Sequence, residues 1–165
     1  MNRRTFLSVL PVAVLAGCGF QLRRVGGIPF ASLYVDAPPG SAVASRVIAQ
    51  LKTLRSTRLA LRAAEADAIL KLDREAVKKS ILSLSGAGRV TEYRLSLEVI
   101  YSIIDPGQRA LAPAETIELS RDITYDDSRV LAKSAEESLL YRDMEEDAAR
   151  RIIRRLQAVK PGGDS

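Results

Sequence analysis

The sequence contains no histidine, no tryptophan and only one cysteine among its 165 residues. Without histidine, a Ser-His-Asp triad, a Cys-His pair and a histidine-containing zinc site are excluded within this chain. A single cysteine also excludes an internal disulfide. Aromatic residues make up 5% of the chain, and no aromatic-lined pair of carboxylates suggests a glycan hydrolase. We therefore expect a protein that binds rather than catalyses, with no catalytic residue, cofactor or metal site.

The composition is that of one soluble globular domain, with 47% hydrophobic and 27% charged residues. The net charge of +5 includes Arg3 and Arg4, and removing these two leaves 23 basic against 20 acidic residues. A nucleic-acid-binding surface needs clustered basic residues with stacking aromatics. The sequence has no such cluster, so we expect no nucleic acid partner.

The first 17 residues have the composition of a secretory leader. Arg3 and Arg4 precede an apolar stretch at residues 6–15, which is too short to span a membrane. The leader ends in LAGC, residues 15–18, which resembles the bacterial lipobox, whose cysteine sulfur receives a diacylglycerol before the leader is cut and the new amine is acylated. We expect Cys18 to be this lipid anchor, although a free thiol beside an ordinary cleavage site has the same composition.

Residue 19 is glycine, whereas an aspartate at that position favours retention of such lipoproteins in the inner membrane. We therefore expect delivery to the outer membrane, on its periplasmic side. The start RRTFL also resembles a twin-arginine signal, so the sequence leaves the general secretory route and the twin-arginine route both open.

The first half of the mature chain predicts a strand, a helix and a long strand. Residues 30–35 are mostly apolar and end at the turn sequence PPG, residues 38–40. Ser41 can cap a helix that ends near Arg55, because the apolar residues between them share one helical face: Val43, Val47, Ile48, Leu51 and Leu54. Residues 68–84 predict a long strand that enters a hairpin at SGAG, residues 85–88.

The second half predicts two more strands and a long helix. Every second residue from 93 to 103 is apolar or aromatic, and the alternation resumes from 117 to 125 after the turn sequence DPG. Arg121 falls on the apolar face, where a buried arginine needs a partner. From Lys133 onward the apolar period changes to about four, which predicts a helix with its buried face at Leu140, Met144, Ala148, Ile152 and Leu156.

The element order β-α-β-β-β-α predicts an α+β fold. We expect a two-layer sandwich in which two helices cover one face of a mostly antiparallel four-stranded sheet. The chain divides into a removed signal peptide at 1–17, a lipidated tether at 18–27, a single domain at 28–158 and a disordered tail at 159–165.

Two kinds of charged cluster are present. The acidic cluster early in the last helix is best explained by helix-dipole matching and pairing of residues four apart: Glu136, Glu137, Asp143, Glu145, Glu146 and Asp147. Basic residues form two looser groups, Lys78 and Lys79 with Arg89 around the hairpin, and Arg129 with Lys133 before the helix. Solvated loops are their simplest explanation, but basic groups beside apolar side chains also suit a phosphorylated lipid. The hairpin tip at 83–88 is a candidate contact surface for a barrel or a lipid.

Several motifs together resemble the LptE family of lipopolysaccharide-assembly lipoproteins, also called RlpB. They are CGFQLR at 18–23, GRVTEY at 88–93, LSRDITY at 119–125, VLAKSAEE at 130–137 and LYRDM at 140–144. Their order and spacing over most of the mature chain make the resemblance specific. It implies an outer-membrane lipoprotein that forms a complex with the LptD barrel, assists its assembly, plugs its lumen and binds lipopolysaccharide on its way to the cell surface.

The resemblance also implies lipopolysaccharide-binding residues. A lysine linked to this binding in the family matches Lys133. The family's basic residue at the hairpin tip falls on a glycine in this sequence, and Arg89 lies a few residues later. One alternative function stays open, a free-standing envelope lipoprotein that carries lipid in an internal cavity.

Overall fold

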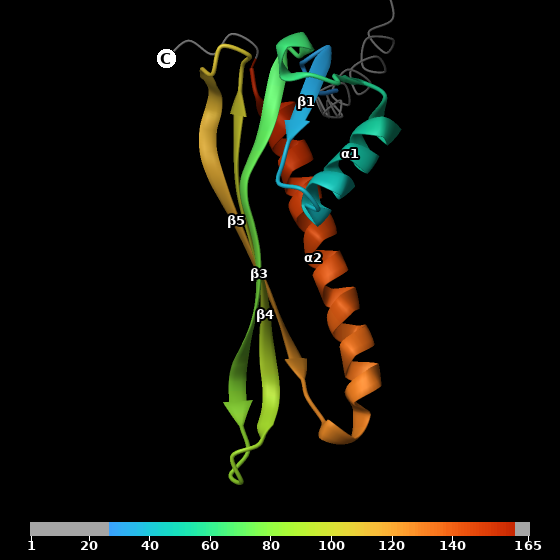
Figure 1. Ribbon diagram of the computed structural model, residues 1–165, viewed down its shortest axis with the longest axis vertical. Helices are drawn as coiled ribbons and strands as arrows, with labels where there is room; N and C mark the ends of the chain where they lie inside the picture. Colours follow the sequence, from blue (N-terminus) through green and yellow to red (C-terminus); the bar gives the residue numbers. More distant parts are fainter. Residues whose placement is uncertain (1–26, 161–165) are drawn as a thin grey trace, which may run out of the picture.

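The computed structural model describes residues 27–160, so Cys18, the predicted leader and the last five residues lie outside the described part of the chain. The molecule is elongated, and its long C-terminal helix runs beside the long strands of the sheet (Figure 1). Its elements are β1 (Ser32–Asp36), α1 (Ala42–Leu54), β2 (Arg58–Leu59), η2 (Ala63–Glu65), β3 (Ala68–Leu84), β4 (Val90–Ile104), β5 (Ala110–Thr124), η3 (Asp127–Arg129) and α2 (Val130–Ala158).

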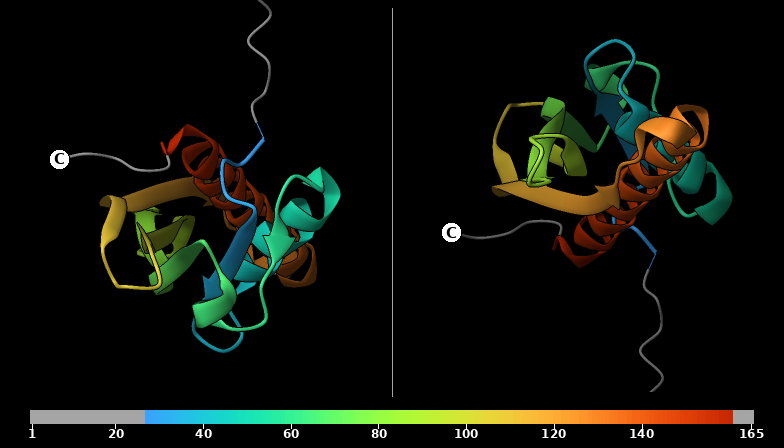
Figure 2. Two further views of the ribbon diagram at one scale, coloured as in Figure 1. Left: turned by 90° about the horizontal axis from the view of Figure 1, so that it is seen from above. Right: turned by 90° about the horizontal axis from the view of Figure 1, so that it is seen from below.

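The strands form one mixed sheet in the order β2-β1-β3-β4-β5. β3, β4 and β5 are antiparallel neighbours, whereas β1 runs parallel to both β2 and β3. Both helices lie on the same side of this sheet (Figure 2). The predicted α+β class is confirmed, but the sheet has five strands rather than four. The missed strand, β2, has two residues, which is too short for an alternating pattern to be visible.

The core lies between the sheet and the two helices. The alternating residues of β4 are buried as predicted: Leu95, Leu97, Val99, Tyr101 and Ile103. The α2 stripe is also confirmed, because Met144, Ala148, Ile152 and Leu156 are fully buried, with Leu140 packed at its margin. Val159 is buried as well, so the packed part of the chain continues one residue past the predicted end of the domain.

Arg121 is exposed and needs no buried partner. It lies on β5, which forms an outer edge of the sheet, and its Nη1 donates a hydrogen bond to the carbonyl of Ser120 at 2.8 Å. A long side chain at a sheet edge reaches water even when its Cβ points toward the core face. The alternating pattern predicted a buried position for Arg121, and this prediction is wrong.

The start of α1 is fixed by two oxygen acceptors. The Ser41 hydroxyl accepts a hydrogen bond from the amide of Ala44 at 2.9 Å, which confirms the predicted cap. Glu75 of β3 accepts from the amides of Ala42 and Val43 at 3.2 and 3.4 Å and also from the Ser41 hydroxyl. This carboxylate supplies the negative charge that the first turn of α1 lacks, and it ties the helix to the sheet. The helix ends at Leu54, which confirms the predicted end near Arg55, and Arg55 itself takes a left-handed backbone conformation.

Candidate functional site

The end of the molecule that carries the β3–β4 hairpin is the candidate site, and we call it the distal end. It consists of the hairpin tip at 85–89, the adjoining parts of β3 and β5, and the first turns of α2. The described chain begins at the opposite end, where β1, β2 and α1 lie (Figure 1). At about 3.3 Å per residue, the 17 residues of β3 span about 55 Å. The distal end is therefore held far from the beginning of the described chain.

Exposed apolar side chains gather at the distal end. Apart from Leu54 and Leu61, the exposed large hydrophobic residues of the described chain lie in the last half of β3 or the first three turns of α2: Val77, Ile81, Leu82, Leu84, Val130, Leu131 and Leu139. Leu131 is 86% exposed. Gathered apolar side chains of this kind mark a surface that contacts lipid or protein.

The hairpin tip presents Arg89 to solvent. The amide of Ser85 donates to the carbonyl of Arg89 at 2.7 Å, and the amide of Gly88 donates to the carbonyl of Ser85 at 2.9 Å. Gly88 has a φ of 74°, a conformation that favours glycine, so the turn is built on this residue. The Arg89 guanidinium is exposed and makes no ion pair within residues 27–160. It is therefore free to meet an anionic ligand.

Lys133 is placed differently, because its side chain is only 15% exposed and already paired. Its ammonium donates to the hydroxyl of Thr124 at 3.1 Å and to the carboxylate of Glu136 at 2.9 Å. These contacts join the first turn of α2 to the end of β5. Thr124 is paired in register with Glu92, and Arg89 lies just before β4, three residues from Glu92, which corresponds to about 10 Å along an extended chain. The structure thus brings both residues to one end without direct contact.

Lys79 forms a cluster under α2 that the sequence did not reveal. Its ammonium lies 2.6 Å from the carboxylate of Glu137 and 4.3 Å from the ring centre of Tyr93, which meets the ring of Tyr125 edge-on at 5.2 Å. The Glu137 hydrogen bond raises the pKa of Lys79. Lys79 is therefore not in a solvated loop, as its grouping with Arg89 suggested, but on β3, cross-strand from Leu95. In the sequence, only the position of Lys79 within the predicted strand at 68–84 indicated that it lies in the sheet.

The acidic cluster of α2 serves mainly to form ion pairs. Glu136 and Glu137 pair with Lys133 and Lys79, Glu145 and Glu146 with Arg46 of α1, and Asp147 with Arg150 and Arg151. The ion-pair interpretation is confirmed, although several partners come from other elements. The helix-dipole interpretation is wrong, because α2 begins at Val130 and its first turn contains no acidic residue.

The turn before α2 is expected to respond to acid. Asp126 accepts hydrogen bonds from the amide and the hydroxyl of Ser128 at 2.9 and 2.8 Å, and the amide hydrogen bond in particular lowers the pKa of this carboxyl. A lowered folded-state pKa means that the contact stabilises the fold above the ordinary value of about 3.9 and is lost as the pH falls through the lowered value. In an NMR titration, we expect the Ser128 amide shift to move only below about pH 3.9, and not to move in Asp126→Asn. A midpoint above that value contradicts this assignment.

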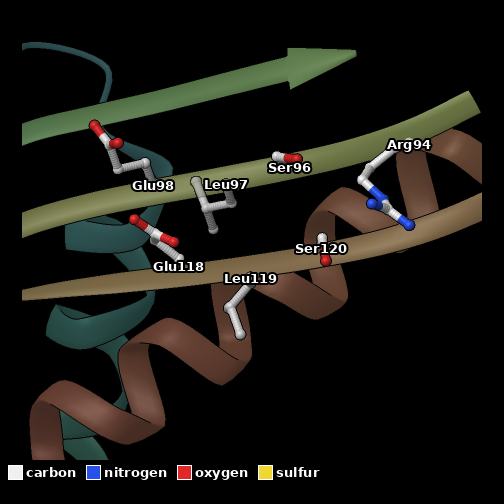
Figure 3. Close-up of a pocket in the computed structure, with 7 residues that line it drawn as sticks. All are labelled: Arg94, Ser96, Leu97, Glu98, Glu118, Leu119 and Ser120. Atoms are coloured by element: carbon white, nitrogen blue, oxygen red, sulfur yellow. The ribbon is translucent and has the colours of Figure 1, made fainter. Parts of the chain in front are cut away.

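Open depressions lie on the surface of the described residues. One, of about 700 Å³, lies beside Phe30, Asp67 and Asp105 at the end opposite the hairpin. Another, of about 400 Å³, lies between β4 and β5 on the face of the sheet that the helices leave uncovered (Figure 3). Neither is an enclosed apolar cavity of the kind that a lipid carrier needs. None of the helices in the described residues is long and apolar enough to cross a membrane.

Comparisons with known proteins identify the class of protein to which this chain belongs. The family model LptE, described as "Lipopolysaccharide-assembly", matches residues 30–156. The LPS-assembly lipoprotein LptE of Photorhabdus laumondii is 32% identical over 158 residues, which cover 94% of this chain and 85% of that protein. The solution structure of lipoprotein B from Nitrosomonas europaea has a TM-score of 0.75 at 35% identity and covers 85% of this chain and 91% of that one.

A second structure, rare lipoprotein B from Shewanella oneidensis, has a TM-score of 0.65 at 29% identity and covers 76% of this chain and 92% of that one. These matches place the chain among lipoproteins of the bacterial envelope that are named for lipopolysaccharide assembly. Within this class, the chain belongs to the LptE family. The predicted family membership is thereby confirmed.

Proposed function

We propose that this protein works in lipopolysaccharide assembly at the outer membrane, anchored through Cys18 and bound to the LptD barrel, whose lumen it plugs and whose assembly it assists. Membership of the LptE family supports the assembly role. The observation that carries the lipid-binding part is the distal end, where exposed apolar side chains lie beside the unpaired Arg89. A phosphorylated, acylated glycolipid needs both kinds of contact.

Arg89 and Lys133 have different roles in this proposal. Arg89 is free and makes the first contact with a phosphate. Lys133 joins the contact by exchanging the exposed carboxylate of Glu136 for a phosphate while it keeps its hydrogen bond to Thr124. The neighbouring apolar residues, Leu84 and Leu131 among them, then contact acyl chains and loosen their packing against one another.

The double variant Arg89→Glu, Lys133→Glu is expected to bind lipopolysaccharide about tenfold or more weakly than wild type, because charged hydrogen bonds contribute about 1.5–3 kcal/mol each and about 1.4 kcal/mol corresponds to tenfold. Binding is measured with labelled lipopolysaccharide in detergent. The control is Lys52→Glu, which reverses one exposed charge in the last turn of α1, half the charge change of the double variant, and should bind as wild type does. Lys133→Met separates loss of charge from repulsion by Glu136. Equal binding by the double variant and wild type sinks the proposed contact.

The partner is tested by purifying tagged protein from detergent-solubilised outer membranes. We expect LptD to accompany it in one-to-one ratio. Recovery of the protein with lipid but without any barrel supports the free-standing carrier instead.

A further inference from the structure

The face of the sheet opposite the helices is uncovered along β3, β4 and β5 (Figure 2). Its side chains are mainly small or polar, and cross-strand neighbours include Ser80 with Arg94 and Asp122, Lys78 with Ser96 and Ser120, and Ala76 with Glu98 and Glu118. We call these three rungs the open face. It contrasts with the distal end, because none of the exposed large hydrophobic residues of the described chain belongs to it. A surface of this kind suits a wet, polar partner rather than acyl chains.

Most charges of the open face are neutralised within the fold. Arg94 holds Asp122 through two hydrogen bonds at 2.8 and 2.9 Å, and Arg74 lies 3.0 Å from the carboxylate of Glu98. Lys78 and Glu118 are the exceptions, since both are exposed and neither makes an ion pair with another described residue. One unpaired positive charge therefore lies toward the β3 side of the face, and one unpaired negative charge lies on β5.

Glu118 also lacks a favourable cross-strand partner. It lies directly across from Glu98 on the neighbouring strand, where like charges repel, and Arg74 offsets only the charge of Glu98. The two carboxylates border the open depression of about 400 Å³ between β4 and β5 (Figure 3). The fold thus keeps an unneutralised carboxylate at a recess, where a cation from outside can reach it.

We propose that the open face docks against the inner wall of the LptD barrel, with a lysine or arginine of that wall bound to Glu118 and an acidic side chain facing Lys78. This inference rests on the proposed function. The inner walls of outer-membrane barrels are polar, which matches the small polar side chains of this face. Two opposite unpaired charges on one face also fix the orientation of the partner, since electrostatic complementarity sets register more than affinity. The apolar distal end stays free for lipid.

The test is Glu118→Lys in full-length tagged protein, compared with wild type, Lys78→Glu and the control Asp143→Lys, which reverses an exposed acidic residue of α2. In the isolated protein, Glu118→Lys removes the repulsion with Glu98, so its unfolding temperature should equal or exceed that of wild type. In the complex the new charge meets a cation, so capture of LptD should fall about tenfold. Glu118→Gln should give an intermediate loss, and Asp143→Lys none.

The outcomes separate the two proposals. Wild type that captures no LptD overturns the proposed function and this inference together. Equal capture of LptD by wild type and Glu118→Lys overturns this inference alone. A substitution of a lumen-facing lysine or arginine of LptD by glutamate that restores capture of Glu118→Lys identifies the partner side chain and supports it. Lipopolysaccharide binding by Glu118→Lys should equal that of wild type, and a parallel loss shows instead that the open face binds lipid.

Discussion

Leu156→Ala is expected to lower the free energy of unfolding by about 2–5 kcal/mol, because the side chain is fully buried between α2 and the sheet and its removal leaves a cavity. The total stability of a domain of this size is about 5–15 kcal/mol, so this single change removes a large part of it. Urea denaturation followed by circular dichroism measures the loss.

Leu139→Ala is the matched control, since it makes the same change in the same helix at a side chain that is 53% exposed. Its effect on stability should stay within about 0.5 kcal/mol, as for other surface substitutions. Because Leu139 belongs to the distal apolar surface, its replacement should instead weaken lipopolysaccharide binding. If Leu139→Ala costs as much stability as Leu156→Ala, then the first turns of α2 are buried and do not belong to an exposed apolar distal end.

The strands and helix faces that were predictable from the sequence are those with long regular periods. Burial in β4 alternates from Arg94 to Ile104 because one face of the strand lies on the core, and α2 repeats about every four residues from Leu140 to Leu156 for the same reason. The beginning of α2 was placed at Lys133, three residues late. Its first residues, Val130 and Leu131, are apolar but exposed, and its cap residue makes no side-chain hydrogen bond, so neither the period nor a capping signal marks the start.

The candidate site was predictable only in part. Lys133 and Arg89 were identified through the resemblance to the LptE family. The sequence did not show that Lys133 is paired with Glu136 whereas Arg89 makes no ion pair within the described residues. Whether a lysine is paired can depend on a side chain distant in sequence, as for Lys79, whose partner Glu137 is 58 positions away. The unpaired state of Glu118 likewise depends on the register between β4 and β5, which sets it against Glu98. Register follows from turn geometry and core packing together, and the sequence pattern alone does not fix it.

In the proposed function, different surfaces of the molecule contact the membrane, the barrel and the lipid. The distal end is apolar with a free cation, the open face is polar with two unpaired charges, and the described chain begins at the far end from the hairpin. A lipid anchor that precedes residue 27 would then leave the distal end pointing away from the attachment point, along a sheet about 55 Å long. Anchor, barrel contact and lipid contact therefore do not compete for the same side chains.

Substitution of Cys18, the predicted lipid anchor, is also expected to have a large effect. We expect Cys18→Ser to abolish incorporation of a radiolabelled fatty acid completely, because the cysteine sulfur is the predicted attachment site and the chain has no other cysteine. Each buried methylene contributes about 0.8 kcal/mol to membrane attachment, and one chain binds only marginally, so several chains are needed for a stable anchor. Labelled protein is measured in immunoprecipitates from cells.

Gly19→Ala and Gly19→Asp are the matched controls, since both keep Cys18 and should be labelled as wild type is. They are expected to differ in destination, because glycine at this position predicts delivery to the outer membrane and aspartate predicts retention in the inner membrane. Fractionation on a sucrose gradient should therefore place Gly19→Ala with the outer membrane and Gly19→Asp with the inner membrane, where its capture of LptD should fall. Labelled Cys18→Ser would show that the acyl chains are attached elsewhere, whereas equal distributions of the two Gly19 variants would show that residue 19 does not decide the destination.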